Sequence, residues 1–155
     1  MNVGSLFQRH ARYRGDRTAF VFDQTRLTYK ELNATINQVA NGLMELGVKK
    51  GDKVATLLPN SQELYETYWA CGKIGAVVVP LSILLMENAL RTLIQDSDSV
   101  ALITTSQFAS VIETLKPDLK AIHEGRYLLI DDHSKPGFKS YHQHKDSCSP
   151  AEPEA

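Results

Sequence analysis

Histidine and cysteine side chains that could bind a metal ion gather near the end of the sequence. His142 and His144 flank a glutamine, Cys148 follows, and His133 lies upstream. Imidazole nitrogen and thiolate sulfur are ligands that Zn²⁺ prefers, but structural zinc sites use regular, paired spacings. The spacing here is irregular and no second pair of ligands supports it. We therefore expect no metal site.

Other reactive side chains are better explained by structure than by catalysis. Cys71 has no histidine near it in the sequence and suits a small core position. Glu63 and Glu66 are neighbours on an expected helix, where a helix start and a solvated face explain them. His10 and His123 have polar or charged neighbours, which favours a solvated surface role. None of these residues predicts a catalytic group.

A phosphate-binding loop is not predicted either. Gly42 and Gly47 have a suitable spacing, but Val48 stands where such a loop needs a lysine. The glycines also fall at the end of an expected helix, not between a strand and a helix. The residues therefore predict no cofactor-binding group.

The elements that would position any site centre on residues 52–81. The runs 54–58 and 76–80 are apolar almost without alternation, which is typical of parallel strands covered by helices on both faces. Asn60 or Ser61 can cap a helix between the two strands. The stretch predicts a βαβ unit.

Upstream, Thr28-Tyr29-Lys30-Glu31 predicts a helix start. It is a capping box, because the Thr28 hydroxyl can accept the Glu31 amide while the Glu31 carboxylate reaches back to the Thr28 amide. The helix should run to about Leu46 with one apolar face. A short helix from Ser5 and a small hairpin over 19–28 are expected before it.

Strands and helices alternate from Lys53 to Ile130. Apolar runs at 100–104 and 127–130 predict two more buried strands. The expected fold is α/β, a layered and mostly parallel sheet flanked by helices with a small N-terminal hairpin. We assign this unit to residues 1–133.

Residues 134–155 are polar, with few aliphatic side chains. They bury too little apolar surface to offset the entropy lost on ordering. We expect a polar linker or a disordered tail.

Composition limits the function further. The 155 residues are 43% hydrophobic and 23% charged with a net charge of −1, which suits one globular domain and offers no basic stripe for nucleic acid. The sequence contains no apolar run long enough to span a membrane and no signal peptide. Two cysteines make no disulfide framework. A cytoplasmic protein is expected.

Two segments resemble core motifs of the adenylate-forming, or AMP-binding, superfamily. Leu27-Thr28-Tyr29-Lys30-Glu31-Leu32 is similar to Leu-Thr-Tyr-x-Glu-Leu, and Lys73-Ile74-Gly75-Ala76-Val77-Val78-Val79-Pro80-Leu81 is similar to Leu-Lys-Ala-Gly-x-Ala-Tyr-Val-Pro. Their order and separation are those of the family. The resemblance covers residues 1 to about 130 and implies the N-terminal portion of an acyl-CoA synthetase of the long- or medium-chain fatty-acid–CoA ligase type.

The resemblance implies a parent enzyme that uses ATP, Mg²⁺ and coenzyme A. That enzyme activates a carboxylic acid, with a fatty acid as the leading candidate, to an acyl-adenylate and passes the acyl group to coenzyme A. The family's phosphate loop, ribose-binding Asp and lid Lys do not occur in this sequence, so we expect the chain to be inactive without the remainder of the ligase. Ser82 and Asp98 stand where many members have Asn and Gly, which affects loop shape more than fold.

Ligands of parallel α/β sheets bind beyond the carboxyl ends of the strands. We expect three loops there to shape the wall of an acyl or coenzyme A channel without donating catalytic groups. Their residues are Pro59, Asn60, Ser61, Leu81, Ser82, Thr104 and Thr105. Helix capping and turn formation explain the same residues without a ligand.

Two alternatives stay open. A free-standing α/β binding or interaction module would need its own ligand signature, and the sequence offers none. An orphaned gene fragment would need no role. In the ligase interpretation, the face that meets the rest of the enzyme would be exposed and would favour self-association.

Overall fold

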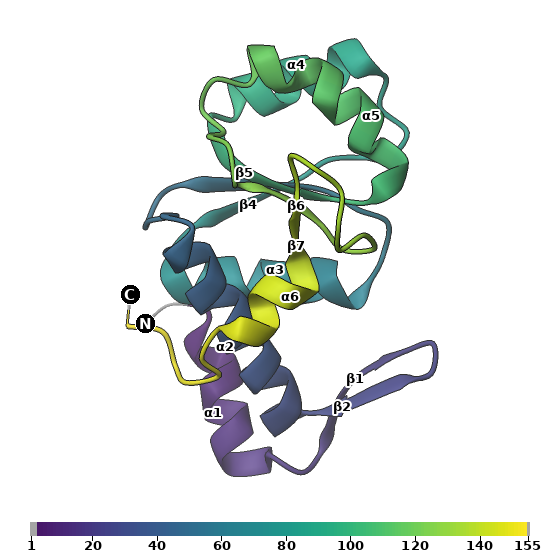
Figure 1. Cartoon of the computed structure of the whole chain (residues 1–155). Coiled ribbons are helices and arrows are strands. Elements are labelled where there is room, and N and C mark those ends of the chain that lie inside the picture. The colour runs from purple at the N-terminus through teal and green to yellow at the C-terminus, as the bar shows by residue number, and fades with distance from the viewer. Residues whose placement is uncertain (1–2, 155) are drawn as a thin grey trace.

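The structure, a computed structural model, describes residues 3–154. Within these residues no helix is both long and apolar enough to cross a membrane. The elements in chain order (Figure 1) are α1 (Ser5–Arg14), β1 (Thr18–Phe22), β2 (Thr25–Thr28), α2 (Tyr29–Glu45), β3 (Lys53–Leu57), α3 (Gln62–Ile74), β4 (Val77–Pro80), α4 (Glu87–Asp96), β5 (Ser99–Thr104), α5 (Ser106–Leu115), the 3-10 turn η1 (Lys116–Asp118), β6 (Tyr127–Leu129), β7 (Lys139–Ser140) and α6 (Tyr141–Ser147).

The main sheet is parallel throughout, with the strand order β4-β3-β5-β6-β7. β1 and β2 form a separate antiparallel hairpin. The predicted fold class is therefore confirmed. Leu57 pairs with Thr104, Thr104 with Leu129, and Leu129 with Ser140, so the carboxyl ends of four strands share one edge.

Helices cover both faces of this sheet, which explains why its strands are apolar without alternation. Val54 and Ile103 point into a core shared with α2 and α3. Ala55 and Leu102 point into a second core shared with α4 and α5. Figure 1 shows the two helical layers on opposite sides of the sheet.

Local signals set the helix ends as predicted. The Thr28 hydroxyl accepts the Glu31 amide, and the Glu31 carboxylate accepts the Thr28 amide at 2.8 Å, which completes the capping box of α2. Ser61 caps α3, and Gly75 ends it with φ 70°, a left-handed conformation that suits glycine. The start of α2 and both ends of α3 therefore depend on residues that lie close together in the sequence.

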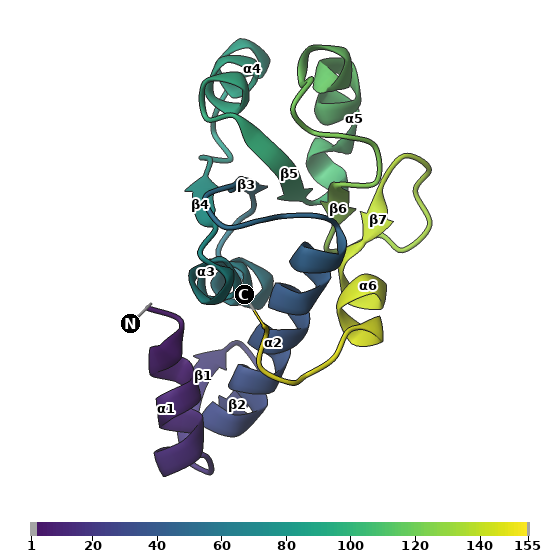
Figure 2. The same ribbon diagram turned by 90° about the vertical axis from the view of Figure 1, so that its left-hand side faces the viewer.

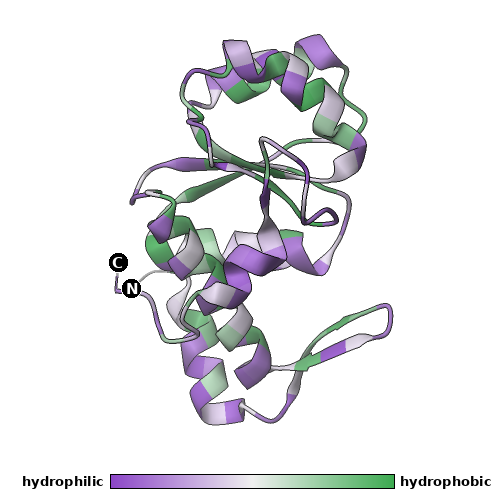
Figure 3. Cartoon of the chain, viewed as in Figure 1, coloured by the Kyte–Doolittle hydropathy of each residue, from purple (hydrophilic) through white to green (hydrophobic). Residues whose placement is uncertain are grey.

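The prediction of a linker or disordered tail over 134–155 does not hold for residues 139–147, which form β7 and α6, whereas 134–138 and 148–154 have no helix or strand. The assigned boundary at 133 falls within the β6–β7 connection. Figure 3 shows that α6 is largely hydrophilic, and Figure 2 shows it beside α2. Tyr141, the first residue of α6, is only 2% exposed. Polar bonds and one buried aromatic ring therefore order a segment that lacks an aliphatic face.

Candidate functional site

The three predicted channel loops follow β3, β4 and β5 and so lie at the carboxyl edge of the sheet. Pro59, Asn60 and Ser82 are exposed there, whereas Leu81 and Thr104 are buried. The fold thus brings these loops to one edge. Part of each of the first two loops is open to a ligand, whereas Thr104 and Thr105 of the third loop are buried.

Hydroxyl groups in these loops have structural partners. The Ser61 hydroxyl accepts the Leu64 amide at 3.2 Å. The Thr104 hydroxyl donates to the Leu57 carbonyl at 2.9 Å across the sheet. The Thr105 hydroxyl is different, because it is buried and has no hydrogen-bond partner among the described atoms.

An acidic residue that the sequence analysis missed caps α5. Neither Thr105 nor Ser106 caps this helix through its own side chain. Instead the Asp131 carboxylate accepts both the Ser106 amide and the Ser106 hydroxyl, each at 2.7 Å. This cap ties the start of α5 to the end of β6 at the same edge.

Four polar side chains form a hydrogen-bonded group that the sequence analysis also missed. His142 Nε2 lies 3.0 Å from Glu63 Oε1, and His133 Nδ1 lies 2.7 Å from the Ser140 hydroxyl. The hydrogen bond with His142 lowers the pKa of Glu63 despite partial burial. Ser140 also caps α6, so its hydroxyl has a structural role. The group joins α3 to the β7–α6 junction.

Glu66 is buried, so the expectation that it lies on a solvated face is wrong. Its carboxylate is fully enclosed and accepts hydrogen bonds from Tyr141 at 2.8 Å and from Gln62 at 2.7 Å. The Lys145 ammonium lies 3.5 Å away and offsets the charge. Burial, and then the negative Glu66, raise the pKa of Tyr141 far above its ordinary range. The phenol therefore stays protonated and acts as a donor.

A second ion pair, between the buried Lys73 and the partly exposed Glu152, holds the segment after α6. Lys73 Nζ lies 2.6 Å from Glu152 Oε2, and the Lys73 side chain is 3% exposed. Asn33 and Asn37 donate to the other oxygen of Glu152 at 2.7 and 3.3 Å. Lys73 belongs to the second core motif, so this motif has a tertiary role as well as a local one.

The structure separates the candidate zinc ligands into different groups. His142 and His133 have the partners described above. His144 and Cys148 instead lie together against α2, beside Glu45. Cys71 is 1% exposed, and burial raises its pKa to about 12, which supports the expected core role.

Described residues do not provide a cradle for nucleotide phosphates. Such a cradle needs a glycine-rich loop between a strand and a helix, usually with a lysine. The strand-to-helix loops at 58–61, 81–86 and 105 contain neither residue type.

These elements define a parallel α/β domain with the strand order β4-β3-β5-β6-β7 and helices on both faces of its sheet. The family model described as AMP-binding enzyme matches residues 7–154, almost the whole chain. The chain belongs to the AMP-binding enzyme family.

Two curated relatives and one solved structure illustrate the similarity. The chain is 41% identical over 113 residues to feruloyl-CoA synthase of Amycolatopsis sp, which covers 73% of the chain and 23% of the relative. It is 34% identical over 117 residues to a long-chain-fatty-acid–CoA ligase of Mycobacterium tuberculosis, with coverages of 74% and 23%. The N-terminal domain of FACL13 from Mycobacterium tuberculosis superposes with a TM-score of 0.82 at 27% identity, covering all of this chain and 38% of that one. The chain thus matches about a quarter of the length of these curated relatives.

Proposed function

We propose that this chain is the N-terminal part of an acid–CoA ligase. In the proposed reaction a carboxylate attacks the α-phosphate of ATP and releases pyrophosphate. The coenzyme A thiol then attacks the acyl carbon of the adenylate and releases AMP. The family match over residues 7–154 carries this proposal, together with relatives whose names are those of CoA ligases and synthases.

In this proposal the described residues support the reaction without performing it. ATP and Mg²⁺ would bind to the remainder of the ligase, since the strand-to-helix loops here lack a phosphate cradle. Pro59, Asn60 and Ser82 are exposed at the carboxyl edge and would form part of an acyl or coenzyme A channel wall. Thr104 is buried, so it would not line the channel and would only stabilise the sheet beneath it.

The β4–α4 loop, at the same edge, has exposed apolar side chains that favour contact with a large partner. Leu84 is 86% exposed and Met86 79% exposed, and Ile83 beside them is also exposed. Exposed apolar side chains in a group are typical of surfaces that another domain covers. We assign this loop to the contact with the remainder of the ligase, and we expect the isolated chain to self-associate through it.

A fatty acid is our first candidate for the substrate, because one relative is named a long-chain-fatty-acid–CoA ligase. The feruloyl-CoA synthase relative makes an aryl acid the second. We also propose a reducing compartment, the cytoplasm, since Cys71 and Cys148 are both free thiols.

ATP–pyrophosphate exchange with fatty and aryl acids tests the proposal. We expect no exchange by the 155-residue chain above a control without enzyme. A chimera in which the chain replaces the matching segment of feruloyl-CoA synthase should catalyse exchange with at least one acid, with the unmodified synthase as reference. Exchange by the chain alone would contradict the proposal that ATP and Mg²⁺ bind to the remainder of the ligase. A chimera that melts cooperatively but is inactive with every acid would overturn the ligase assignment.

A further inference from the structure

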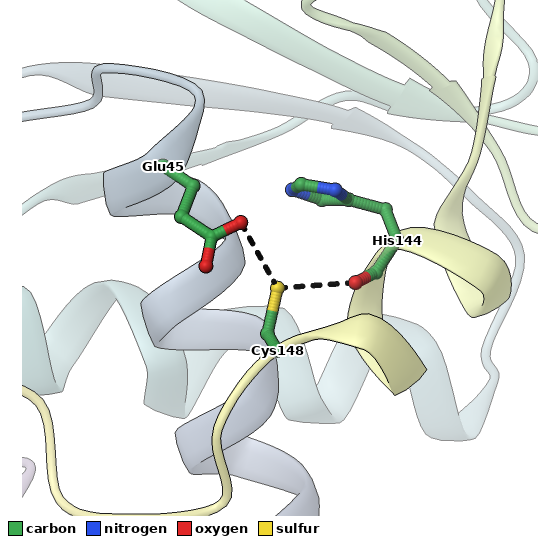
Figure 4. Close-up of side chains that lie close together, drawn as sticks. All are labelled: Glu45, His144 and Cys148. Atoms are coloured by element: carbon green, nitrogen blue, oxygen red, sulfur yellow. Dashed lines mark hydrogen bonds between the residues drawn. The ribbon is translucent and has the colours of Figure 1, made fainter.

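We propose that Glu45, His144 and Cys148 form a Zn²⁺ site that joins α6 to α2. Each residue offers one ligand atom, and these three atoms all lie within 4.8 Å of one another. Figure 4 shows the three side chains converging from the end of α2 and the end of α6. The site stands apart from the carboxyl-edge loops and does not depend on the proposed ligase activity.

The donor set suits zinc better than magnesium or calcium. A thiolate sulfur and an imidazole nitrogen favour Zn²⁺, and a carboxylate oxygen is a common third ligand. The charges of Glu45 and a Cys148 thiolate would together balance the divalent ion. Three protein ligands leave a fourth tetrahedral position for water, on the side where Glu45 is exposed to solvent.

The spacing of the ligand atoms is close to that of a tetrahedral site. Sulfur and oxygen bound to Zn²⁺ at usual bond lengths lie about 3.5 Å apart. Cys148 Sγ and Glu45 Oε2 are separated by 3.5 Å in the structure. The third atom, on His144, lies within 4.8 Å of the other two, so it needs to move by at most about 1.3 Å to reach the same spacing. A change of that size is within the reach of an imidazole rotation.

The backbone places these ligands through two helix relationships. His144 lies on α6 and Cys148 is the C-cap residue four positions later, and both side chains approach Gly42 of α2. Gly42 on α2 lies directly beneath them. A Cβ added at Gly42 would meet the His144 ring at 3.2 Å and Cys148 Sγ at 3.3 Å, both tighter than ordinary contact. A glycine in a helix interior lowers helix stability, and here it makes room for the ligands.

Without metal, weaker bonds hold the same groups in place. His144 Nε2 is hydrogen-bonded to the Gly42 carbonyl at 2.9 Å, and the Cys148 thiol donates to the His144 carbonyl at 3.0 Å. Metal binding would replace the thiol proton, which passes to solvent, and an imidazole lone pair would join the ion. His142, whose ring contacts Glu63, takes no part.

Such a site would have a structural role, holding α6 against α2, and no catalytic one. α6 has little apolar surface, and one hydrogen bond, between His144 and the Gly42 carbonyl, joins it to α2 beside the packing of Tyr141. A metal bound by α6 and α2 together would stabilise the folded arrangement, because the unfolded chain does not preform the three ligands. Metal would then further stabilise the polar segment after β7, which hydrogen bonds and the buried Tyr141 ring already order.

Metal titration of the purified chain, stripped with a chelator, tests the site. We expect one Zn²⁺ per chain, proton release on binding, and a cobalt–thiolate charge-transfer band when Co²⁺ replaces Zn²⁺. Zn²⁺ should also raise the Tm and slow amide exchange in α6. Cys148→Ser should abolish the cobalt band, and Cys148→Ser or His144→Gln should weaken Zn²⁺ binding by more than about tenfold.

His142→Gln and Cys71→Ser are the matched controls, since neither residue belongs to the site. Both should bind Zn²⁺ as the unchanged chain does. Because a variant could fail to fold, each is first required to show the circular dichroism of the unchanged chain without metal. Absence of a cobalt–thiolate band, or unchanged affinity in folded Cys148→Ser, would overturn the proposal. Equal weakening in His142→Gln would also overturn it, by showing that binding is diffuse.

Discussion

The Tyr141 phenol donates a 2.8 Å hydrogen bond to Oε2 of Glu66 and so joins α6 to α3 in the interior. The two side chains are 2% and 0% exposed. A carboxylate enclosed in this way needs donors, because removing a charge from water is costly. α6 therefore docks by satisfying a buried acid rather than by burying an aliphatic face.

Tyr141→Phe should reveal the strength of this contact. The substitution keeps the ring and removes one donor from the buried carboxylate. We expect the free energy of unfolding to fall by about 1–3 kcal/mol in urea denaturation. Tyr13→Phe, at an exposed ring, is the control and should change little. Equal stability of the two variants would mean that the Glu66 contact is dispensable.

Glu152 should make stability depend on pH. Burial alone would raise its pKa, but hydrogen bonds from Asn33 and Lys73 and the Lys73 charge lower it below the ordinary 4.5. The folded carboxyl thus releases its proton more readily than the unfolded one. Its stabilisation is present above the unfolded pKa and is lost as pH falls through the folded pKa.

Glu152→Gln should therefore lower the urea midpoint at neutral pH and reduce the further loss on acidification. Amide exchange over 149–154 should quicken in the same variant, because the tether to Lys73 is weakened. Glu154→Gln, at an exposed position, is the control. Parallel pH profiles for the unchanged chain and Glu152→Gln would refute the linkage.

Thr28→Ala should destabilise the chain by about 1 kcal/mol through loss of the capping box. Thr28→Ser keeps an acceptor hydroxyl and should retain most of the stability. Thermal unfolding of both variants measures the difference. In the ligase chimera, loss of adenylation by Thr28→Ala at an unchanged Tm would contradict a purely structural role.

Leu84→Ser with Met86→Ser should reduce self-association of the isolated chain. Both side chains are exposed in the β4–α4 loop and contribute little to either core, so the fold should be unaffected. Light scattering across a concentration series measures the effect. Val21→Ser, an exposed apolar position on the hairpin, serves as the comparison. A monomeric unchanged chain would argue against the assigned contact surface.

The sequence by itself determined the local structure and the fold class. The capping box depends on residues three apart, and the apolar strands at 54–58 and 100–104 predict a covered parallel sheet. The two core motifs identified the family for the same reason, since each is a short stretch whose residue types specify a helix start or a helix–strand junction. Signals of this kind are readable because their interacting groups lie close together in the chain.

Only the tertiary structure decided where the polar groups go. Glu66 and Tyr141 are 75 residues apart, and Cys148 and Glu45 are 103 apart. Neither pair has a local pattern, so Glu66 was expected on a solvated face and α6 in a disordered tail. Apolar content predicts order only for segments that dock through hydrophobic burial. α6 docks instead because folding brings donors to an enclosed carboxylate, and the low polarity around that carboxylate makes each bond worth more than it would be in water.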